Sequence, residues 1–256
     1  MRPYLLAETN WKAVNSTDYE LAILPWGATE AHNYHLPYST DVVESDYISA
    51  ESARLAWESG AKVIVLPTVP FGVNTGQLDI KLNINMNPST QFAILRDVVD
   101  ALSRQGIRKL LVMNGHGGND FKQMIRELLP QFPDIFICTM SWFQILDLTE
   151  FFDEPGDHAG EMETSIMLHV VPDLVLPLSE AGDGAEFKIK LDGIREGWAW
   201  TQREWTKATR DTGVGNPAAA TVEKGRRYLE AVCEKIASFL VELSDADVED
   251  LYESQN

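Results

Sequence analysis

The chain alternates short apolar runs with longer stretches in which apolar residues recur at helical spacing. The apolar runs lie at Leu21–Leu24, Lys62–Leu66, Lys109–Met113 and Ile135–Met140. Runs this short, most of them closed by Pro or Gly, are typical of strands buried on both faces of a parallel sheet. We therefore predict four strands at these positions.

Helical periodicity fills the intervals between the predicted strands, and residues suited to helix caps mark several of the starts. The expected helices run from about Thr40 to Ser59, from Pro88 to Gly106, from Phe121 to Leu129, from the Asp157–Ser165 stretch to just before Pro172, and from about Ala218 to Leu243. Strands that alternate with helices in this way favour right-handed crossovers. They predict a three-layer α/β/α sandwich with a mostly parallel sheet.

Two regions depart from this alternation. Leu78 to Met86 alternates apolar and polar residues, which predicts an edge strand or a hairpin. Leu174 to Gly215 is long and irregular, and the tryptophans within Trp198–Trp205 fit a subunit contact or the core better than substrate stacking. Because no linker, repeat or low-complexity run divides the chain, we expect residues 1–256 to form one domain, with an acidic, loosely held tail from about residue 244.

The charge balance narrows the class of partner. The 256 residues carry a formal net charge of -18 at pH 7, so the surface repels phosphate backbones and anionic lipid. No apolar run reaches the length of a membrane span, and the N-terminus lacks the apolar core of a signal peptide. We therefore expect a cytoplasmic protein that binds neither nucleic acid nor membranes, with Cys138 and Cys233 as buried free thiols.

The histidines are concentrated where a parallel sheet would gather ligands. Four of the five histidines, His32, His35, His116 and His158, lie in loops that follow strand-like runs and contain Gly or Pro. Loops after parallel strands open at the same edge of the sheet. We expect five ligand-type groups to converge there: Glu30, His32, Asp41, His116 and one acid of the pair Glu161 and Glu163.

The residue types in this group indicate a catalytic metal centre. Carboxylates and imidazoles without thiolates suit Zn, Mn or Fe(II), whereas a structural zinc site is usually built from cysteines. Five ligands exceed the need of one open catalytic ion, but they fit two ions when a carboxylate bridges them. Asp41 is the natural bridge, because the free N–H groups in the first turn of its predicted helix favour an ionised carboxylate.

Several of these residues also have ordinary structural interpretations. The Asn114–Asn119 stretch is equally typical of a tight strand-to-helix turn or of an anion-binding nest. Glu161 and Glu163 could both complement the dipole of the helix that they begin. His169 lies in the middle of that helix among apolar neighbours, so we interpret it as structural.

Three blocks of the sequence resemble the signature blocks of the creatininase (creatinine amidohydrolase) family. They are Glu30–Pro37 with Asp41, Asn114–Asn119, and His158–Ser165, in that order along the chain. A weaker match to the family's C-terminal block begins at Gly215. The resemblance covers nearly the whole chain.

The resemblance implies a three-layer α/β fold, a centre with two divalent ions, and hydrolysis of a non-peptide C–N bond, as in cyclic amides, lactams or formamides. It also implies a homo-oligomer, usually a hexamer. The ligands carried over are Glu30, Asp41 and His116 for one ion and His32, Asp41 and Glu163 for the other. His158 would lie beside the substrate as an acid or oxyanion partner, with Glu161 behind Glu163 in the proton transfer.

The same blocks supply residues around the ligands. His35 is expected behind Glu30 or His32, because outer hydrogen bonds fix the geometry of metal ligands. The other residues expected near ligands or substrate are Asn33, Tyr34, Asn114, Gly117 and Gly118. Gly118 stands where creatininase has a glutamate ligand, so the resemblance passes that role to Glu163. Asn33 and Tyr34 replace a usual Gly-Pro, so the substrate itself stays open.

The function predicted from the sequence is that of an amidohydrolase that cleaves a small-molecule amide with a water activated by two metal ions. Two alternatives remain open. The same centre could enolise a sugar or keto acid, which would make the protein an isomerase or lyase. The protein could also be a non-catalytic, metal-dependent binding module. Release of amine or carboxylate from a panel of amides and lactams separates these functions.

Overall fold

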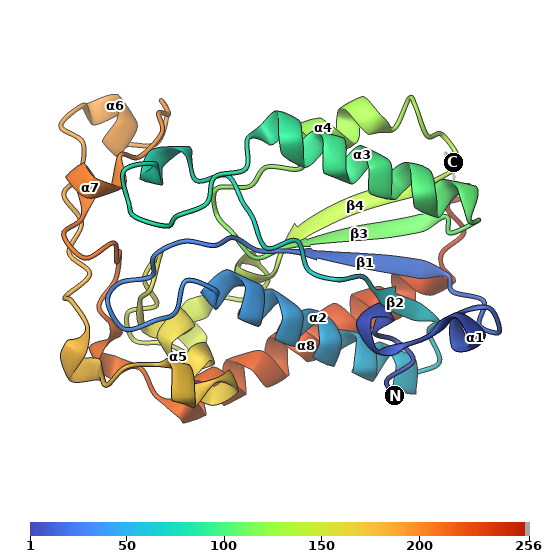
Figure 1. The fold of residues 1–256 in the computed structure, drawn as a ribbon, viewed down its shortest axis with the longest axis horizontal. Coiled ribbons are helices and arrows are strands. Elements are labelled where there is room, and N and C mark those ends of the chain that lie inside the picture. Colours follow the sequence, from blue (N-terminus) through green and yellow to red (C-terminus); the bar gives the residue numbers. More distant parts are fainter. Residues whose placement is uncertain (254–256) are drawn as a thin grey trace.

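A parallel four-stranded sheet forms the centre of the computed structural model, which describes residues 1–253 (Figure 1). The strands are β1 (Leu21–Trp26), β2 (Val63–Val65), β3 (Lys109–Asn114) and β4 (Phe136–Ser141). They are ordered β2-β1-β3-β4, with Ala22 of β1 opposite Ile64 on one side and opposite Leu110 on the other. All four predicted strands are therefore present.

Helices cover both faces of the sheet (Figure 1). On one face lie α3 (Pro88–Arg104) and α4 (Lys122–Leu128), and on the other α2 (Thr40–Glu58), α5 (Glu161–Val170) and α8 (Val222–Asp245). The short helices are α1 (Trp11–Val14), α6 (Asp192–Arg195) and α7 (Trp205–Ala208). This arrangement confirms the three-layer α/β/α sandwich.

The two hydrophobic cores are filled by alternate residues of the same strands, because side chains alternate across a sheet. Leu21 and Ile23 of β1 pack with α2, α5 and α8, whereas Ala22 and Leu24 pack with α3 and α4. Burial on both faces explains why these strands are continuous apolar runs. Among the described residues no helix is long and apolar enough to cross a bilayer.

The order of the strands reverses between β1 and β3. From β1 the chain crosses to β2 on one side, and later returns to place β3 on the other side of β1. In open parallel sheets, ligands bind outside the carboxyl ends of the strands at such a reversal. The loops after β1 and β3 carry Glu30, His32 and His116, so the topology brings these residues to one place.

The segment from Leu78 to Met86 is not the strand that its alternation predicts. It makes only isolated bridges and leaves Leu78 and Leu82 70% and 72% exposed. Of its polar side chains, Asp79 and Lys81 are exposed, whereas Asn83 faces the protein and accepts the backbone N–H of Ala31 at 2.8 Å. The pattern misleads because residues of one predicted face are not buried alike: Met86 is in the core, while Leu78 and Leu82 face solvent.

The last helix begins and ends later than the pattern predicts. The Thr221 side chain accepts the backbone N–H of Lys224 and so starts α8, which continues to Asp245. Ser244 is buried, and its hydroxyl donates to the Glu20 carboxylate at 2.6 Å. The acidic tail therefore starts after α8, and residue 244 itself is held by the fold.

Candidate metal centre

The predicted ligands form one cluster at the carboxyl end of the sheet, buried except for the partly exposed Glu163. Glu30 and His32 follow β1, Asp41 lies in the first turn of α2, His116 follows β3, and Glu163 lies in the first turn of α5. Two sets of three ligand atoms lie within 4.8 Å of one another: Glu30, Asp41 and His116, and His32, Asp41 and Glu163. Asp41 belongs to both sets.

The two oxygens of Asp41 face different histidines. Oδ1 lies 2.8 Å from His32 Nε2, and Oδ2 lies 3.0 Å from His116 Nδ1, which is also 2.9 Å from Glu30 Oε1. Despite these distances, His32 Nε2 and Asp41 Oδ2 have no hydrogen-bond partner among the described residues. The atoms converge on shared points in space, as ligands do around an ion.

Backbone carbonyl groups set the tautomers of the three histidines in the cluster. The paired atoms are His32 Nδ1 with the Glu30 carbonyl oxygen at 3.1 Å, His116 Nε2 with that of Val73 at 3.1 Å, and His158 Nε2 with that of Ala31 at 2.9 Å. A carbonyl oxygen only accepts, so each of these nitrogens carries a proton. The opposite nitrogen of each ring faces the carboxylates and is the one available to a metal ion.

Opposite charges dominate the electrostatics of the cluster. Burial alone would lower the pKa of His32 and His116 and raise that of Asp41, but the opposite charges outweigh it. The Asp41 carboxylate raises the pKa of His32 to about 10, and His32 holds the pKa of Asp41 well below its usual range. The donor set therefore fits divalent cations, which would replace protons on these imidazoles.

A further acid, Glu44, lies one helical turn after Asp41 on α2. It is fully buried, and among the described residues neither of its carboxyl oxygens has a hydrogen-bond partner. Burial, together with the nearby carboxylates of Glu163 and Asp41, raises the pKa of Glu44 well above its usual value. Sequence reasoning missed it, and the only signal was its spacing of three residues from Asp41.

Glu161 and Glu163 lie in the same turn of α5 but have different partners. Glu163 belongs to the ligand cluster. The Glu161 carboxylate accepts from Lys224 of α8 and from the backbone N–H of Glu154, the latter at 2.7 Å. The structure thus separates the pair and places Glu161 between α5 and α8.

His158 borders the cluster on the side of the irregular segment. Its ring stacks on that of His32 with centroids 4.1 Å apart, and its Nδ1 lies 3.9 Å from Glu30 Oε1. Trp205, at the start of α7, packs edge-on against the same imidazole with centroids 4.7 Å apart. His158 also forms a third set of converging ligand atoms with Glu30 and His32. Its free nitrogen can therefore exchange a proton or contact an ion.

Asn33 and Tyr34 fasten the irregular segment to the loop after β1. The Asn33 backbone has a φ of +53°, and its side chain accepts the N–H of Gly182 at 2.8 Å. Its backbone N–H donates to the Thr212 hydroxyl at 3.0 Å. The Tyr34 hydroxyl donates to the carbonyl of Arg210 at 3.1 Å. Both residues thus hold in place a segment that covers the cluster.

His35 is buried but turns away from the ligands. Its Nε2 lies 2.9 Å from the Thr164 hydroxyl of α5, and burial together with the charge of His32 lowers its pKa to about 4. The expectation that it orients Glu30 or His32 is corrected by these contacts. A backbone carbonyl orients His32, and the Gln77 side chain donates to Glu30.

The loop Asn114–Asn119 is shaped by one amide and one glycine. Asn114 Oδ1 accepts the N–H of His116 at 3.1 Å, and its Nδ2 donates to the His116 carbonyl at 3.0 Å. A Cβ at Gly118 would collide with the His116 ring, whereas the space beside Gly117 is open. A ligand side chain at 118 would therefore displace His116, and the ligand must come from another element.

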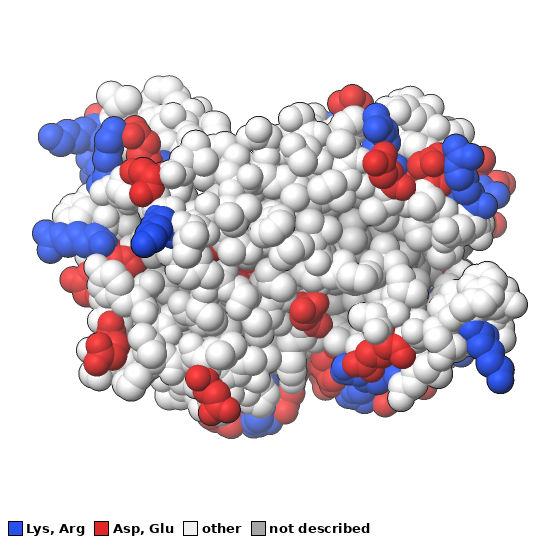
Figure 2. Space-filling model, viewed as in Figure 1, with Lys and Arg blue, Asp and Glu red and all other residues white. Residues whose placement is uncertain are grey.

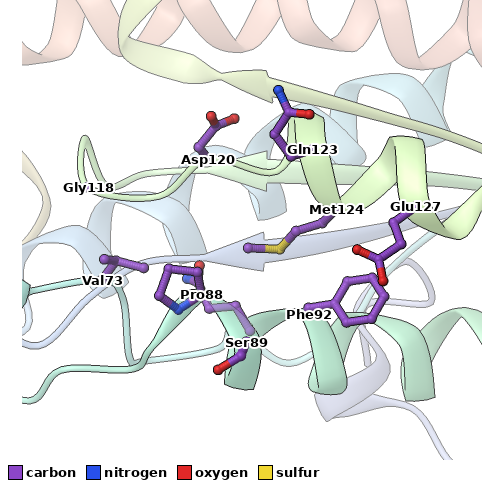
Figure 3. A pocket seen from close by; sticks show the side chains of 10 residues that line it. Val73, Pro88, Ser89, Phe92, Gly118, Asp120, Gln123, Met124 and Glu127 are labelled. Atoms are coloured by element: carbon purple, nitrogen blue, oxygen red, sulfur yellow. The ribbon is translucent and has the colours of Figure 1, made fainter. Parts of the chain in front are cut away.

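A cavity of about 540 Å³ lies behind this loop, between α3 and α4 (Figure 3). Phe92 of α3 and Met124 of α4 form its apolar wall, and Asp120 and Glu127 lie at its polar side. Gly118 is the point at which the cavity approaches the cluster. Neither Glu30 nor the other acids of the cluster line it.

Two segments, residues 72–85 and 182–213, cover the cluster. The Thr206 hydroxyl of the second donates to Asp79 of the first at 2.5 Å, and a Cβ at Gly76 would collide with the Arg203 carbonyl. As a result Glu30, His32, Asp41, His116 and His158 are at most 7% exposed.

Comparison with known proteins gives consistent matches. Residues 7–240 match the model of a family described as creatininase, creatinine amidohydrolase. A crystal structure of a Bacteroides fragilis protein, assigned provisionally as a creatinine amidohydrolase, is 45% identical and covers 99% of this chain and 100% of its own, with a TM-score of 0.92.

Two curated relatives are more distant. The creatinine amidohydrolase of Pseudomonas putida is 27% identical over 199 residues, which are 66% of this chain and 73% of its own. The mycofactocin precursor peptide peptidase of Mycobacterium tuberculosis is 26% identical over 223 residues, 83% of this chain and 81% of its own. Two creatininase structures, described as a manganese form and as a Zn–Zn form, share the fold with TM-scores of 0.76 and 0.75. Each is 23% identical to this chain, and the match covers 95% of this chain and 99% of theirs.

Proposed function

Because the chain belongs to the creatininase family, we propose that its buried cluster is the metal centre of a hydrolase that cleaves a small amide C–N bond. The enzyme class follows from the family, whose curated relatives here are an amidohydrolase and a peptidase. The observation that carries the proposal is Asp41, which presents one oxygen to His32 and the other to His116 within 3.0 Å. A bridging carboxylate between two ions has this arrangement.

The protein would hold the two ions with the two trios that share Asp41. When bound, such ions supply a Lewis acid for a carbonyl oxygen and lower the pKa of a water that acts as nucleophile. His158 is anchored through Nε2–H to the Ala31 carbonyl, so its Nδ1 can take up a proton at the cluster and deliver it to a leaving nitrogen. General acid–base catalysis of this kind contributes about 10² to 10⁴ in rate.

Glu161 would contribute through position and not through contact with substrate. Its hydrogen bonds to Lys224 and to the Glu154 backbone hold the first turn of α5, which carries Glu163. The segments 72–85 and 182–213 would exclude bulk water from the reacting groups. Trp205 would keep the His158 ring in place, since the two rings pack directly.

The cover over the cluster favours a small amide as substrate. Of the proposed ligands only Glu163 is partly exposed, and such a covered site admits a compact molecule more readily than a chain that must thread through it. A peptide C–N bond is the second candidate, because a relative that matches 83% of this chain is named a precursor peptide peptidase. That relative is 26% identical, so the name alone does not transfer its substrate.

The test begins with metal analysis of protein purified without chelator. We expect close to two divalent ions, Zn, Mn or Fe, per chain. The same protein is then incubated with cyclic amides including creatinine, lactams, formamides and short peptides, and released amine and carboxylate are measured. His158→Gln should keep the ions and lose about 10²-fold or more in turnover. A protein that binds no more than trace metal, and releases no product with added Zn or Mn, would refute the proposal.

Three further features belong to the same proposal: the assembly of the protein, its domain organisation and its location in the cell. A homo-oligomer, with the hexamer implied by the family resemblance, would cover the exposed Trp198 and Trp200 side chains. The single continuous family match over residues 7–240 supports one domain. The acidic composition is consistent with action in the cytoplasm, away from nucleic acid and membrane surfaces.

A further inference from the structure

Glu30 has a hydrogen-bond partner that lies outside the ligand set. Gln77 Nε2 donates to Glu30 Oε2, and Gln77 Oε1 accepts from Asn83 Nδ2. Asn83 Oδ1 in turn accepts the backbone N–H of Ala31 at 2.8 Å. The contacts form a closed path from the Glu30 side chain through two amides to the backbone of the next residue.

The direction of every hydrogen bond in this path is set by its last member. The Ala31 N–H can only donate, so Asn83 must present its oxygen to it and its nitrogen to Gln77. The Gln77 oxygen is then occupied, and only its NH₂ group is left for the carboxylate. Glu30 Oε2 therefore accepts this hydrogen bond.

We propose that Gln77 and Asn83 are positioning residues for Glu30, which keep Oε2 bonded to the protein and leave only Oε1 to a metal ion. Oε1 is the oxygen that lies 2.9 Å from His116 Nδ1, inside the ligand cluster. The inference rests on the proposed metal centre and adds to it the residues that orient one ligand. Outer partners of this kind are typically worth 10- to 100-fold in metal affinity.

The loop that carries the two amides buries a polar side chain and exposes apolar ones, which is unusual for a surface loop. Gln77 is 2% exposed, whereas Leu78 and Leu82 are 70% and 72% exposed. Leu82, directly before Asn83, has a φ of +65°, a left-handed conformation that is rare for a leucine. A loop selected only for packing would bury the leucines and expose the amides. Strained backbone kept next to a cluster of this kind is typical of a functional position.

The first test removes the amide of Gln77 but keeps the length of the side chain. Gln77→Met should weaken the affinity for Mn²⁺ or Zn²⁺, measured by competition with a chromophoric chelator, about 10- to 100-fold. Gln202→Met is the matched control, because Gln202 accepts from Thr75 of the same loop at 3.1 Å and touches no ligand. The control should bind both metals as the wild type does.

The second test asks whether the two amides act in series. Asn83→Ala alone should weaken metal binding, but in a Gln77→Met background it should cause no further loss beyond about twofold, because the path is already broken. Losses that multiply in the double variant would overturn the inference and indicate independent structural effects. The visible d–d spectrum of the Co²⁺-loaded proteins should change in Gln77→Met and stay unchanged in Gln202→Met.

The outcomes separate this inference from the proposed function. If the wild type binds neither Mn²⁺ nor Zn²⁺, the metal centre and the inference fall together. If the wild type binds and Gln77→Met binds within twofold of it, only the inference falls. Should Gln77→Met fail to fold, Gln77→Glu takes its place, because it keeps the shape of the side chain and sets a second carboxylate against Glu30. An unchanged affinity of Gln77→Glu for Mn²⁺ or Zn²⁺ would overturn the inference.

Discussion

At the scale of single residues, the cluster depends on Asp41 more than on any other ligand. It is the one acid shared by both trios, and it lies where the first turn of α2 offers unpaired N–H groups and a positive dipole end. Each of its neighbours belongs to only one of these two trios, although Glu30 and His32 also form a third set with His158. We therefore expect a substitution of Asp41 to affect both ions, and a substitution of a ligand from one trio to affect one ion.

Asp41→Ala should remove both ions, whereas His32→Ala should remove one and spare the ion held by Glu30, Asp41 and His116. The reason is that a bridge takes part in two coordination spheres. Metal content per chain, measured by plasma emission after dialysis, checks this expectation. Asp46→Ala, an exposed change on the same helix, should keep both ions. Equal metal loss in the Asp41 and His32 variants would count against the bridge.

The affinity for metal should rise with pH. In the metal-free protein the pKa of His32 is raised to about 10, against about 6.5 in the unfolded chain. The stabilising pair of His32 with Asp41 is therefore fully present below about pH 6.5 and is lost as the pH rises through about 10. An incoming ion must displace that proton throughout this interval.

The expected result is an apparent Kd for Mn²⁺ that falls by up to about tenfold per pH unit for each proton displaced. Titrations at several pH values between about 6 and about 8.5, all below the raised pKa of about 10, measure it. The metal-free protein should lose thermal stability as the pH rises from about 6.5 towards about 10. A Kd independent of pH would show that His32 binds the ion without giving up a proton.

At the scale of elements, the first turn of α5 shows how one helix serves two purposes. Glu161 and Glu163 are two residues apart, which turns their side chains about 200° from each other around the helix axis. One carboxylate therefore reaches the ligand cluster while the other meets Lys224 of α8. Both carboxylates cannot face the same ion.

Glu161→Gln should lower the free energy of unfolding by about 1.5 kcal/mol, because Lys224 loses the charge of its buried partner but keeps the Asp153 carboxylate at 2.8 Å. It should leave the metal content unchanged. Glu163→Gln should show the opposite result, with loss of one ion and a smaller change in the stability of the metal-free protein. Denaturant unfolding of metal-free protein and metal analysis of loaded protein measure the two effects. Loss of metal in Glu161→Gln would place that residue in the centre instead.

The loop of residues 72–85 is the element that sequence reasoning interpreted least well. Its stretch Leu78–Met86 alternates with the period of a strand, yet Asn83 points inward to a backbone group while Leu78 and Leu82 face solvent. Periodicity reports which residues share a face but not which face is buried. The neighbours that decide this lie far away in the chain, at residues 29–31 and 202–206.

At the scale of the whole molecule, charge is unevenly distributed. Residues 186–210 hold six Lys and Arg against four Asp and Glu, whereas the whole chain holds 21 against 39. Figure 2 shows Lys and Arg gathered over the end of the molecule that carries α6 and α7. Trp198 and Trp200, 76% and 83% exposed, lie in the same stretch. A basic stretch with exposed indoles is suited to contact an acidic surface, such as that of another copy.

Trp200→Ser should therefore shift the protein to smaller assemblies, measured by light scattering after gel filtration. Loss of a large aromatic from the centre of an interface commonly costs 2 kcal/mol or more, about 30-fold in the dissociation constant. Trp11→Ser is the matched control, because Trp11 on α1 is 77% exposed at a different place. An unchanged mass for Trp200→Ser, or an equal shift for Trp11→Ser, would argue against this contact surface.

The sequence by itself determined the four strands, the main helices and the convergence of the loops after β1 and β3. Those features depend on local apolar patterns and on the rule that parallel strands share one edge. Only the tertiary structure decided that Glu163 and not Glu161 joins the cluster, that Asn33 fastens the cover, and that Gln77 holds Glu30 from 47 positions away. Helix rotation and loop path are set by packing between distant residues, and no local pattern encodes them.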